Sequence, residues 1–230
     1  MVTIPQPITM LADREQRIAM TYDEFLARVN DSLHAEWIDG EVVIFMPPND
    51  RHQALVSLLD TLLTLFVRVY GLGIVRVSPY QMRATPDGPA REPDLLFVAQ
   101  AHLDRVTPNR LVGPADLVIE IISDESVARD RVEKFYEYQA VGILEYWLID
   151  PRLGKERIDI YRLDDQGKYR AVLPDTTGRY TTPLLPGFSF NPDWLWQLPT
   201  PDLLPIMVDL FRDKLIEALG LVHGSGDASL

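Results

Sequence analysis

Two short apolar runs in this chain each contain a carboxylate at a position where an aliphatic side chain would be expected. Residues 91–98 read Arg-Glu-Pro-Asp-Leu-Leu-Phe-Val, with Asp94 at the start of the apolar part; residues 116–123 read Asp-Leu-Val-Ile-Glu-Ile-Ile-Ser, with Glu120 in the middle. Such runs predict buried strands. A buried charge costs several kcal/mol unless it is paired, and two carboxylates on one sheet repel each other unless a cation lies between them. We therefore interpret Asp94 and Glu120 as ligands of one divalent cation.

A simpler alternative exists for each residue alone. Asp94 is explained equally well as a solvated residue at a strand end or as a partner of a helix cap. Glu120 is harder to explain in this way, because apolar residues flank it on both sides and alternation alone does not bring it to the solvent. The two residues together are more informative than either one.

Composition narrows the class of protein. The 230 residues suffice for one sizeable domain, and 47% hydrophobic with 24% charged residues is typical of a globular protein. With no cysteine, disulfides, cysteine-based zinc sites and thiol catalysis are excluded. We expect no membrane span, since no apolar run reaches eighteen residues, no secretory signal in residues 1–16, and a cytoplasmic location. A net charge of −12 argues against a surface that coats nucleic acid, but not against a nuclease with local cations.

The remaining patterns predict an α/β fold, with one mixed β-sheet flanked by helices on both faces, an added β-hairpin and a C-terminal helix. Asp39-Gly40 predicts a hairpin between two strands, the first of which contains Glu36. The other expected elements are a helix opened by a capping box at 21–24, a long helix over 50–70 capped by Asp50, a helix over 127–140, a strand over 143–150, a hairpin over 156–173 and a helix over 201–221. The predicted organisation is a lead-in (1–19), one domain (20–198), a C-terminal helical extension (199–222) and a disordered tail (223–230).

The candidate site has the chemistry of a hard dication. Mg2+, or Mn2+, would be held by Asp94, Glu120 and a backbone carbonyl, for which Ile121 is the candidate. Lys134 is the candidate ammonium that stabilises charge on a phosphate. Asp130, Lys134 and Tyr138 share one helix face, because they lie four residues apart. The alternative for Asp130 and Lys134 is a plain surface ion pair.

Three further residues are weaker candidates for the same site. His52 could face it from the start of the long helix, although a lone histidine there is more often a cap or a surface group. Gln81 could point into the same cleft, or could be a strand surface residue. Tyr138 is better explained as core packing with a satisfied hydroxyl than as a catalytic group.

These residues together carry a resemblance to a known family. Glu36, the Glu92-Pro93-Asp94 run, Glu120-Ile121-Ile122-Ser123, Lys134 with Tyr138, and residues 142–150 resemble the Uma2 family (DUF820) over about residues 20–195. Members of that family are regarded as restriction-endonuclease-like proteins of the PD-(D/E)XK nuclease superfamily.

The resemblance implies a restriction-endonuclease-like core over 20–198, magnesium dependence and hydrolysis of phosphodiester bonds. Asp94 would match the first acidic position and Glu120 the second, with Glu36 as the acid from the N-terminal part of the core and a further candidate ligand. The superfamily pattern asks for lysine two positions after the second acid, where this chain has Ile122. Lys134 would then be a lysine relocated to the following helix.

Two functions remain open at this point. The first is a Mg2+-dependent DNA endonuclease; the second is a catalytically inactive protein that keeps the nuclease fold as a binding or assembly module. The missing lysine at position 122 and the charge of −12 favour the second. The apolar stripes of helices 51–70 and 201–221 exceed what one core covers, so we also expect a homodimer. Sequence specificity, and DNA against RNA, stay undecided.

Overall fold

The computed structural model describes residues 16–28 and 34–220, and its centre is a mixed six-stranded sheet in the order β12-β11-β10-β9-β7-β4. Strands β9 and β10 are parallel, and the other neighbours are antiparallel. The strands are β4 (Gly73–Val77), β7 (Leu95–Ala99), β9 (Leu117–Ile121), β10 (Glu145–Asp150), β11 (Arg157–Leu163) and β12 (Tyr169–Val172). The predicted α/β class is confirmed.

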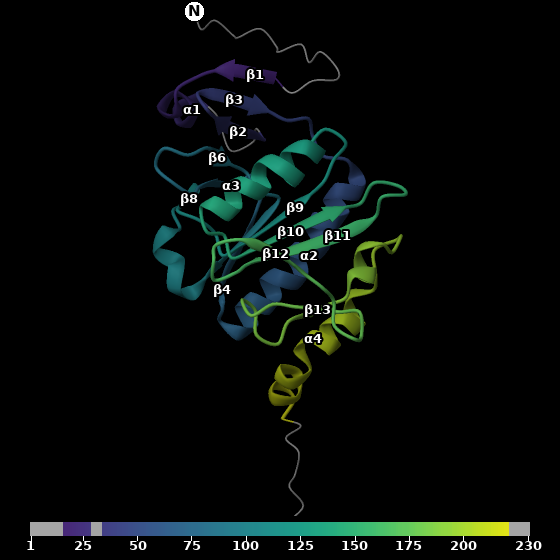
Figure 1. Cartoon of the computed structure of the whole chain (residues 1–230). Helices are drawn as coiled ribbons and strands as arrows, with labels where there is room; N and C mark the ends of the chain where they lie inside the picture. The colour runs from purple at the N-terminus through teal and green to yellow at the C-terminus, as the bar shows by residue number, and fades with distance from the viewer. Residues whose placement is uncertain (1–15, 29–33, 221–230) are drawn as a thin grey trace, which may run out of the picture.

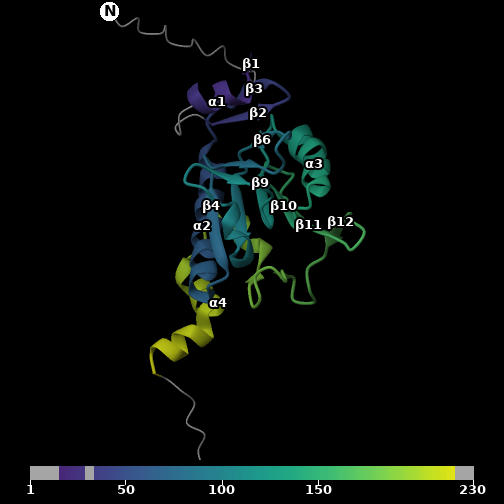
Figure 2. The same ribbon diagram turned by 90° about the vertical axis from the view of Figure 1, so that its left-hand side faces the viewer.

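Helices cover both faces of this sheet, as Figures 1 and 2 show. Helices α2 (Asp50–Tyr70) and α4 (Leu203–Ala218) pack on one face, against alternate strand residues such as Ile119. Helix α3 (Lys134–Ala140) packs on the other face with Val118 and Leu148. Because successive residues of a strand face opposite sides, Glu120 faces the same side as Val118, toward α3.

A second six-stranded sheet lies beside the first, in the order β1-β3-β2-β6-β5-β8. Its strands are β1 (Gln16–Ala19), β2 (Ala35–Ile38), β3 (Glu41–Ile44), β5 (Gln81–Arg83), β6 (Ala90–Arg91) and β8 (Arg110–Val112). The prediction of a single sheet was therefore wrong. Pro93 has no N–H to donate to a ladder, so the chain leaves β6 at Glu92-Pro93 and enters β7 of the central sheet.

The N-terminal part contains two predicted local motifs and one unexpected strand. Asp39 and Gly40 have positive φ angles of 48° and 86° and join β2 to β3. The predicted capping box is present at the start of α1 (Tyr22–Arg28), where the backbone N–H of Thr21 donates to the carboxylate of Glu24. Strand β1 falls within the stretch assigned to the lead-in. It pairs with β3 and so satisfies backbone groups that would otherwise be exposed along that edge of the sheet.

The N-cap of helix α2 lies one residue before the predicted cap, and the helix begins at Asp50. Asn49, not Asp50, accepts the hydrogen bond from the backbone N–H of His52 at 2.9 Å, because Asn49 still has extended backbone angles. Gly71, with φ of 65°, ends the helix. By length and a mean hydropathy of 1.4, α2 could cross a membrane, a criterion that core helices also meet. Its seven buried residues pack on the central sheet, as in a core helix.

The helix after β9 contains an irregular turn. Residues 127–140 are helical, and the turn Arg129–Glu133 is a π-helix, in which the N–H of Lys134 donates to the carbonyl of Arg129. Such turns are frequent at functional sites. Asp130 and Lys134 are both buried beside it.

The C-terminal region is part of the core. Helix α4 spans Leu203–Ala218, shorter than the predicted 201–221, because Asp202 caps its N-terminus by accepting from Leu204 at 3.0 Å. Ile206, Leu210 and Phe211 pack with α2 in the main hydrophobic cluster. The predicted hairpin of β11 and β12 is present, and β13 (Tyr180–Thr181) pairs with β14 (Ser189–Phe190), which leads to a short 3-10 helix at Pro192–Leu195.

Candidate functional site

A cavity of about 940 Å³ opens where the two sheets meet the start of α2 and the helix that contains Lys134. Acidic and basic side chains from all of these elements line it. Those that matter for the chemistry are Glu36, His52, Asp94, Glu120, Asp130 and Lys134.

Asp94 and Glu120 occupy facing positions on neighbouring strands. Strands β7 and β9 pair Leu95 with Ile119, so one further step of the same register puts Asp94 opposite Glu120. Directly opposite residues of an antiparallel pair project from the same face, and both side chains line the cavity. Asp94 is fixed further, since its Oδ2 accepts the backbone N–H of Ile121 at 2.7 Å.

The ammonium of Lys134 lies among three carboxylates. Its Nζ is 2.8 Å from Glu120 Oε1, 3.0 Å from Glu36 Oε1 and 3.6 Å from Asp130 Oδ1. The Lys134 side chain is 4% exposed. The interpretation of Asp130 and Lys134 as a surface pair is therefore wrong: a π-helical turn and α3 direct both side chains into the interior.

Glu36 is held by cations on both of its oxygens. Oε2 accepts from Arg91 at 2.9 Å, and Oε1 accepts from the backbone N–H of Glu92 at 3.2 Å besides Lys134. Burial alone would raise the pKa of Glu36, but Lys134 and Arg91 outweigh burial and lower it to about 2. Because two cations, Lys134 and Arg91, already neutralise its single negative charge, Glu36 is better suited to hold Lys134 than to bind a metal ion.

Arg91 extends this network to α3. Its guanidinium also donates to Glu137, with the Nη2 to Oε2 distance at 2.6 Å. Sequence reasoning missed Arg91 and Glu137 as partners. Arg91 directly precedes the Glu-Pro-Asp run, and this position could have indicated a role at the site. Glu137 lies beside the predicted face of Asp130, Lys134 and Tyr138, and nothing in the sequence indicates its contact with Arg91.

Glu120 is the carboxylate whose negative charge the nearby cations do not fully neutralise. It accepts from Lys134 and, at 2.9 Å, from the Tyr138 hydroxyl. Burial raises the pKa of Glu120; Lys134 opposes this effect, whereas Asp130 and Asp94 add to it, and the result is about 8. The site therefore favours one more positive charge, whether a proton or a metal ion.

Two further polar atoms indicate the same excess of negative charge. Asp130 Oδ1 is buried and accepts no hydrogen bond from the described residues. His52 Nε2 lies 3.2 Å from Asp94 Oδ1. Burial would lower the pKa of His52, but the hydrogen bond and charge of Asp94 overcome burial and raise it. His52, predicted with lower weight, thus lies in the cavity and contacts an acid.

Gln81 and Tyr138 have other roles. Gln81, on β5, accepts from the hydroxyl of Tyr22 on α1 at 3.0 Å and does not line the cavity. The structure therefore does not bring Gln81 to the acids, where it was predicted with lower weight. Tyr138 is fully buried and bonds Glu120, as expected for core packing with a satisfied hydroxyl.

The donor set fits a magnesium-like ion in part. Among the described residues no group of three or more histidine, aspartate or glutamate side chains has the arrangement of a metal cluster. Magnesium is usually held by only one or two carboxylates, with water and phosphate oxygens completing its shell. Asp94 and Glu120 supply two such carboxylates at the cavity, and the excess negative charge favours a cation there; the Ile121 carbonyl stays a predicted third ligand.

The fold is that of an α/β protein with mixed sheets flanked by helices, and its candidate site is a buried group of acids around one ammonium. Among solved structures, a crystal structure from Anabaena variabilis, titled a "putative nuclease belonging to DUF820", is similar with a TM-score of 0.64 and 19% identity; the match covers 77% of this chain and 97% of that one. The sequence over residues 22–194 matches the Uma2 family, described as "Putative restriction endonuclease". The chain belongs to the Uma2 family, as the resemblance implied. No curated protein matches it.

Removing the central cation tests the electrostatics of the site. Lys134→Met leaves Glu36, Glu120 and Asp130 facing one another in the interior, so we expect the free energy of unfolding to fall by about 3–5 kcal/mol. Urea unfolding at neutral pH measures it. The control is Lys214→Met, which removes an exposed pair with Glu217 and should leave the free energy of unfolding nearly unchanged. Equal losses from the two variants would contradict a buried charge cluster.

Proposed function

We propose that this protein is a cytoplasmic, Mg2+- or Mn2+-dependent endonuclease that hydrolyses phosphodiester bonds of DNA. The observation that carries the proposal is the facing placement of Asp94 and Glu120 in one cavity, with the Lys134 ammonium 2.8 Å from Glu120. Membership of a family described as a restriction endonuclease supports the reaction class.

Each residue has a distinct role in this proposal. Asp94, Glu120 and the Ile121 carbonyl would hold a divalent ion, which would supply Lewis acidity to the phosphate and would lower the pKa of a bound water. Lys134 orients Glu120 and stabilises negative charge that develops on the phosphate. Burial would lower the pKa of Lys134, but Glu120, Glu36 and Asp130 raise it far above its usual range, so Lys134 acts as a fixed charge and not as a base.

Lys134 fills the place that the superfamily gives to a strand lysine. Ile122, at that strand position, is buried in the apolar cluster around Tyr138, so it contributes packing only. A lysine from the following helix reaches the second acid instead. Glu36 and Arg91 support it from the second sheet.

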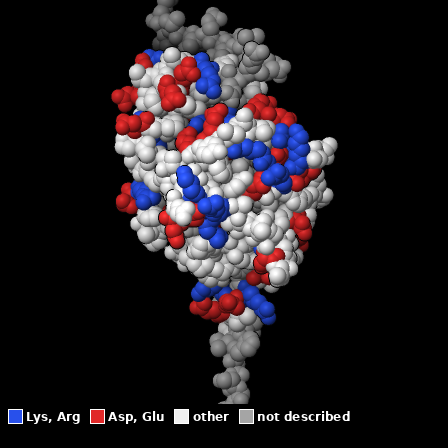
Figure 3. All heavy atoms as spheres, viewed as in Figure 1, with Lys and Arg blue, Asp and Glu red and all other residues white. Residues whose placement is uncertain are grey.

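Cations at the cavity favour a nucleic acid substrate. Arg129, Arg152 and Lys155 line it and can contact phosphates. On the face that carries α3, Lys and Arg side chains alternate with Asp and Glu and form no continuous basic surface (Figure 3). Together with the net charge of −12, this arrangement supports binding through a few local contacts.

The second candidate is a nuclease-fold protein without activity. One observation favours it: Lys134 is already engaged by three carboxylates, which leaves its ammonium little freedom to contact a phosphate. Such a protein would bind DNA or a partner without cleaving it.

Cleavage of duplex and single-stranded DNA in Mg2+ separates these candidates. Asp94→Asn removes a proposed ligand and should lower the cleavage rate at least about 100-fold. The matched control is Asp116→Asn, a buried aspartate at the opposite end of β9 that holds Ala99 and His102 and does not line the cavity; it should retain activity. If the wild-type protein binds DNA without cleaving it, the second candidate holds; if Asp94→Asn cleaves normally, the assignment fails.

We further propose that the protein pairs with a second copy through α4, which would bring two sites to the two strands of a duplex. Leu204, Val208, Leu215 and Leu219 are 70%, 50%, 39% and 68% exposed. Leu204 and Val208 lie four residues apart before the kink of α4 at Phe211, and Leu215 and Leu219 lie four residues apart after it, so each half of the helix presents an exposed apolar pair. The helix extends from the body of the molecule (Figures 1 and 2).

Sedimentation velocity at micromolar concentration tests this pairing. We expect a dimer for the wild-type protein and a monomer for the double variant Leu204→Glu, Leu215→Glu, because charges oppose burial of the two apolar pairs. Val112→Glu alters an exposed apolar residue on β8 (53% exposed) and should stay dimeric. A wild-type monomer would contradict the proposal.

A further inference from the structure

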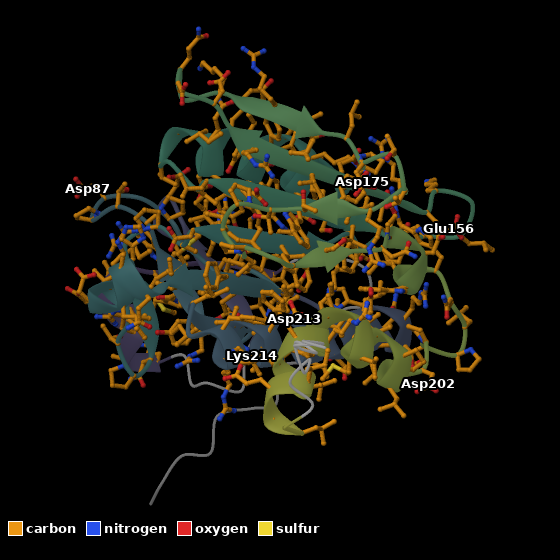
Figure 4. The ribbon with its side chains drawn as sticks, turned by 90° about the horizontal axis from the view of Figure 1, so that it is seen from below. Asp87, Glu156, Asp175, Asp202, Asp213 and Lys214 are labelled. Atoms are coloured by element: carbon orange, nitrogen blue, oxygen red, sulfur yellow. The ribbon has the colours of Figure 1, made fainter. Side chains whose placement is uncertain are left out.

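The turn between β10 and β11 presents an apolar side chain at the mouth of the cavity. Leu153 is 96% exposed, the highest value among the large hydrophobic residues of the described chain, and it lines the cavity with its neighbour Arg152. Figure 4 shows that the turn, marked by Glu156, projects from the edge of the molecule. A single exposed leucine is common on protein surfaces, so a functional role for Leu153 must be argued from its surroundings.

The turn is braced although its tip is exposed. The Arg152 guanidinium donates to both carboxylate oxygens of Asp150, at 2.8 and 2.9 Å, and its backbone N–H donates to Asp150 Oδ1 at 3.3 Å. Arg131 holds the same carboxylate from the helix, at 3.1 Å. The N–H of Lys155 closes the turn on the Arg152 carbonyl at 2.8 Å. Leu153 is therefore held out into the solvent by a preorganised support.

A second part of the cavity lining has the same chemistry. Met46, 47% exposed, lies on the connection between β3 and α2 with Phe45 beside it, and both line the cavity. The Arg129 guanidinium lies 4.2 Å from the centre of the Phe45 ring. Exposed apolar side chains with cations beside them suit a ligand that combines base faces with phosphates.

We infer that Leu153 is a wedge that enters the base stack of duplex DNA next to the cleaved phosphate. This inference rests on the proposed function and names its substrate as duplex DNA that is unstacked at one step. Arg152 and Lys155 flank the wedge and contact the phosphates on either side. Apolar side chains inserted in this way kink a duplex, and flexible pyrimidine–purine steps or mismatches cost least to open.

The first test uses a fluorescent base and requires no cleavage. A duplex with 2-aminopurine at the step is bound by Asp94→Asn protein in Mg2+, and its fluorescence should rise as the base unstacks. Adding Leu153→Ser should remove most of the rise at saturating protein. The matched control is Leu173→Ser, an 81% exposed leucine outside the cavity lining, which should leave the rise intact. An unchanged signal with Leu153→Ser overturns the wedge.

The second test uses cleavage of three substrates by otherwise wild-type protein. Leu153→Ser should slow cleavage of a fully paired duplex about tenfold, equivalent to about 1.4 kcal/mol. It should change cleavage of a mismatched duplex or a single strand less than about twofold, because those bases are already unstacked. Equal cleavage of all three substrates by Leu153→Ser and wild type overturns the wedge and leaves the nuclease standing. A protein that neither cleaves nor binds any of them overturns both.

Discussion

A single buried ammonium, that of Lys134, connects the parts of the fold on which the site depends. Glu36 comes from the second sheet, Glu120 from the central sheet and Asp130 from the π-helical turn, and all three lie within 4 Å of the Lys134 nitrogen. Without that charge, three carboxylates would face one another in the interior, which is strongly unfavourable. The packing of the sheets and the helix is thus coupled to the electrostatics of the site.

The charges do not balance within this cluster. Lys134 is shared among three acids, Arg91 is shared between Glu36 and Glu137, and Asp94 has His52 as its neighbour. This excess of negative charge, together with burial, raises the pKa of Glu120 and keeps it protonated near neutrality. A divalent ion would replace that proton. In the proposed function, affinity for a metal ion would come from the fold, because burial and the neighbouring acids raise the pKa of Glu120 and so favour a cation beside it.

Much of the fold and part of the site followed from local patterns. The Asp39-Gly40 turn, the apolar stripe of α2 and the two carboxylates within apolar runs carry their signals over a few residues. What could not be predicted depends on contacts between distant segments: the division into two sheets at Pro93, the π-helical turn, and the bond from Arg91 to Glu137. The hydrogen bond between Gln81 and Tyr22 is a further contact of this kind, since it joins β5 to α1.

The most direct test of the central claim is the stability of the metal-free protein as a function of pH. Folded Glu120 keeps its proton to about pH 8, whereas in the unfolded chain the pKa returns toward 4.5, so folding binds a proton and stability must fall as pH rises between these values. His52 and Glu92 also have raised pKa values and contribute with the same sign, so the comparison is with Glu120→Gln. We predict that the variant loses less stability than wild type from pH 5 to about pH 8, and that Mn2+ at the higher pH stabilises wild type alone. Parallel curves, with equal effects of Mn2+, would contradict the account.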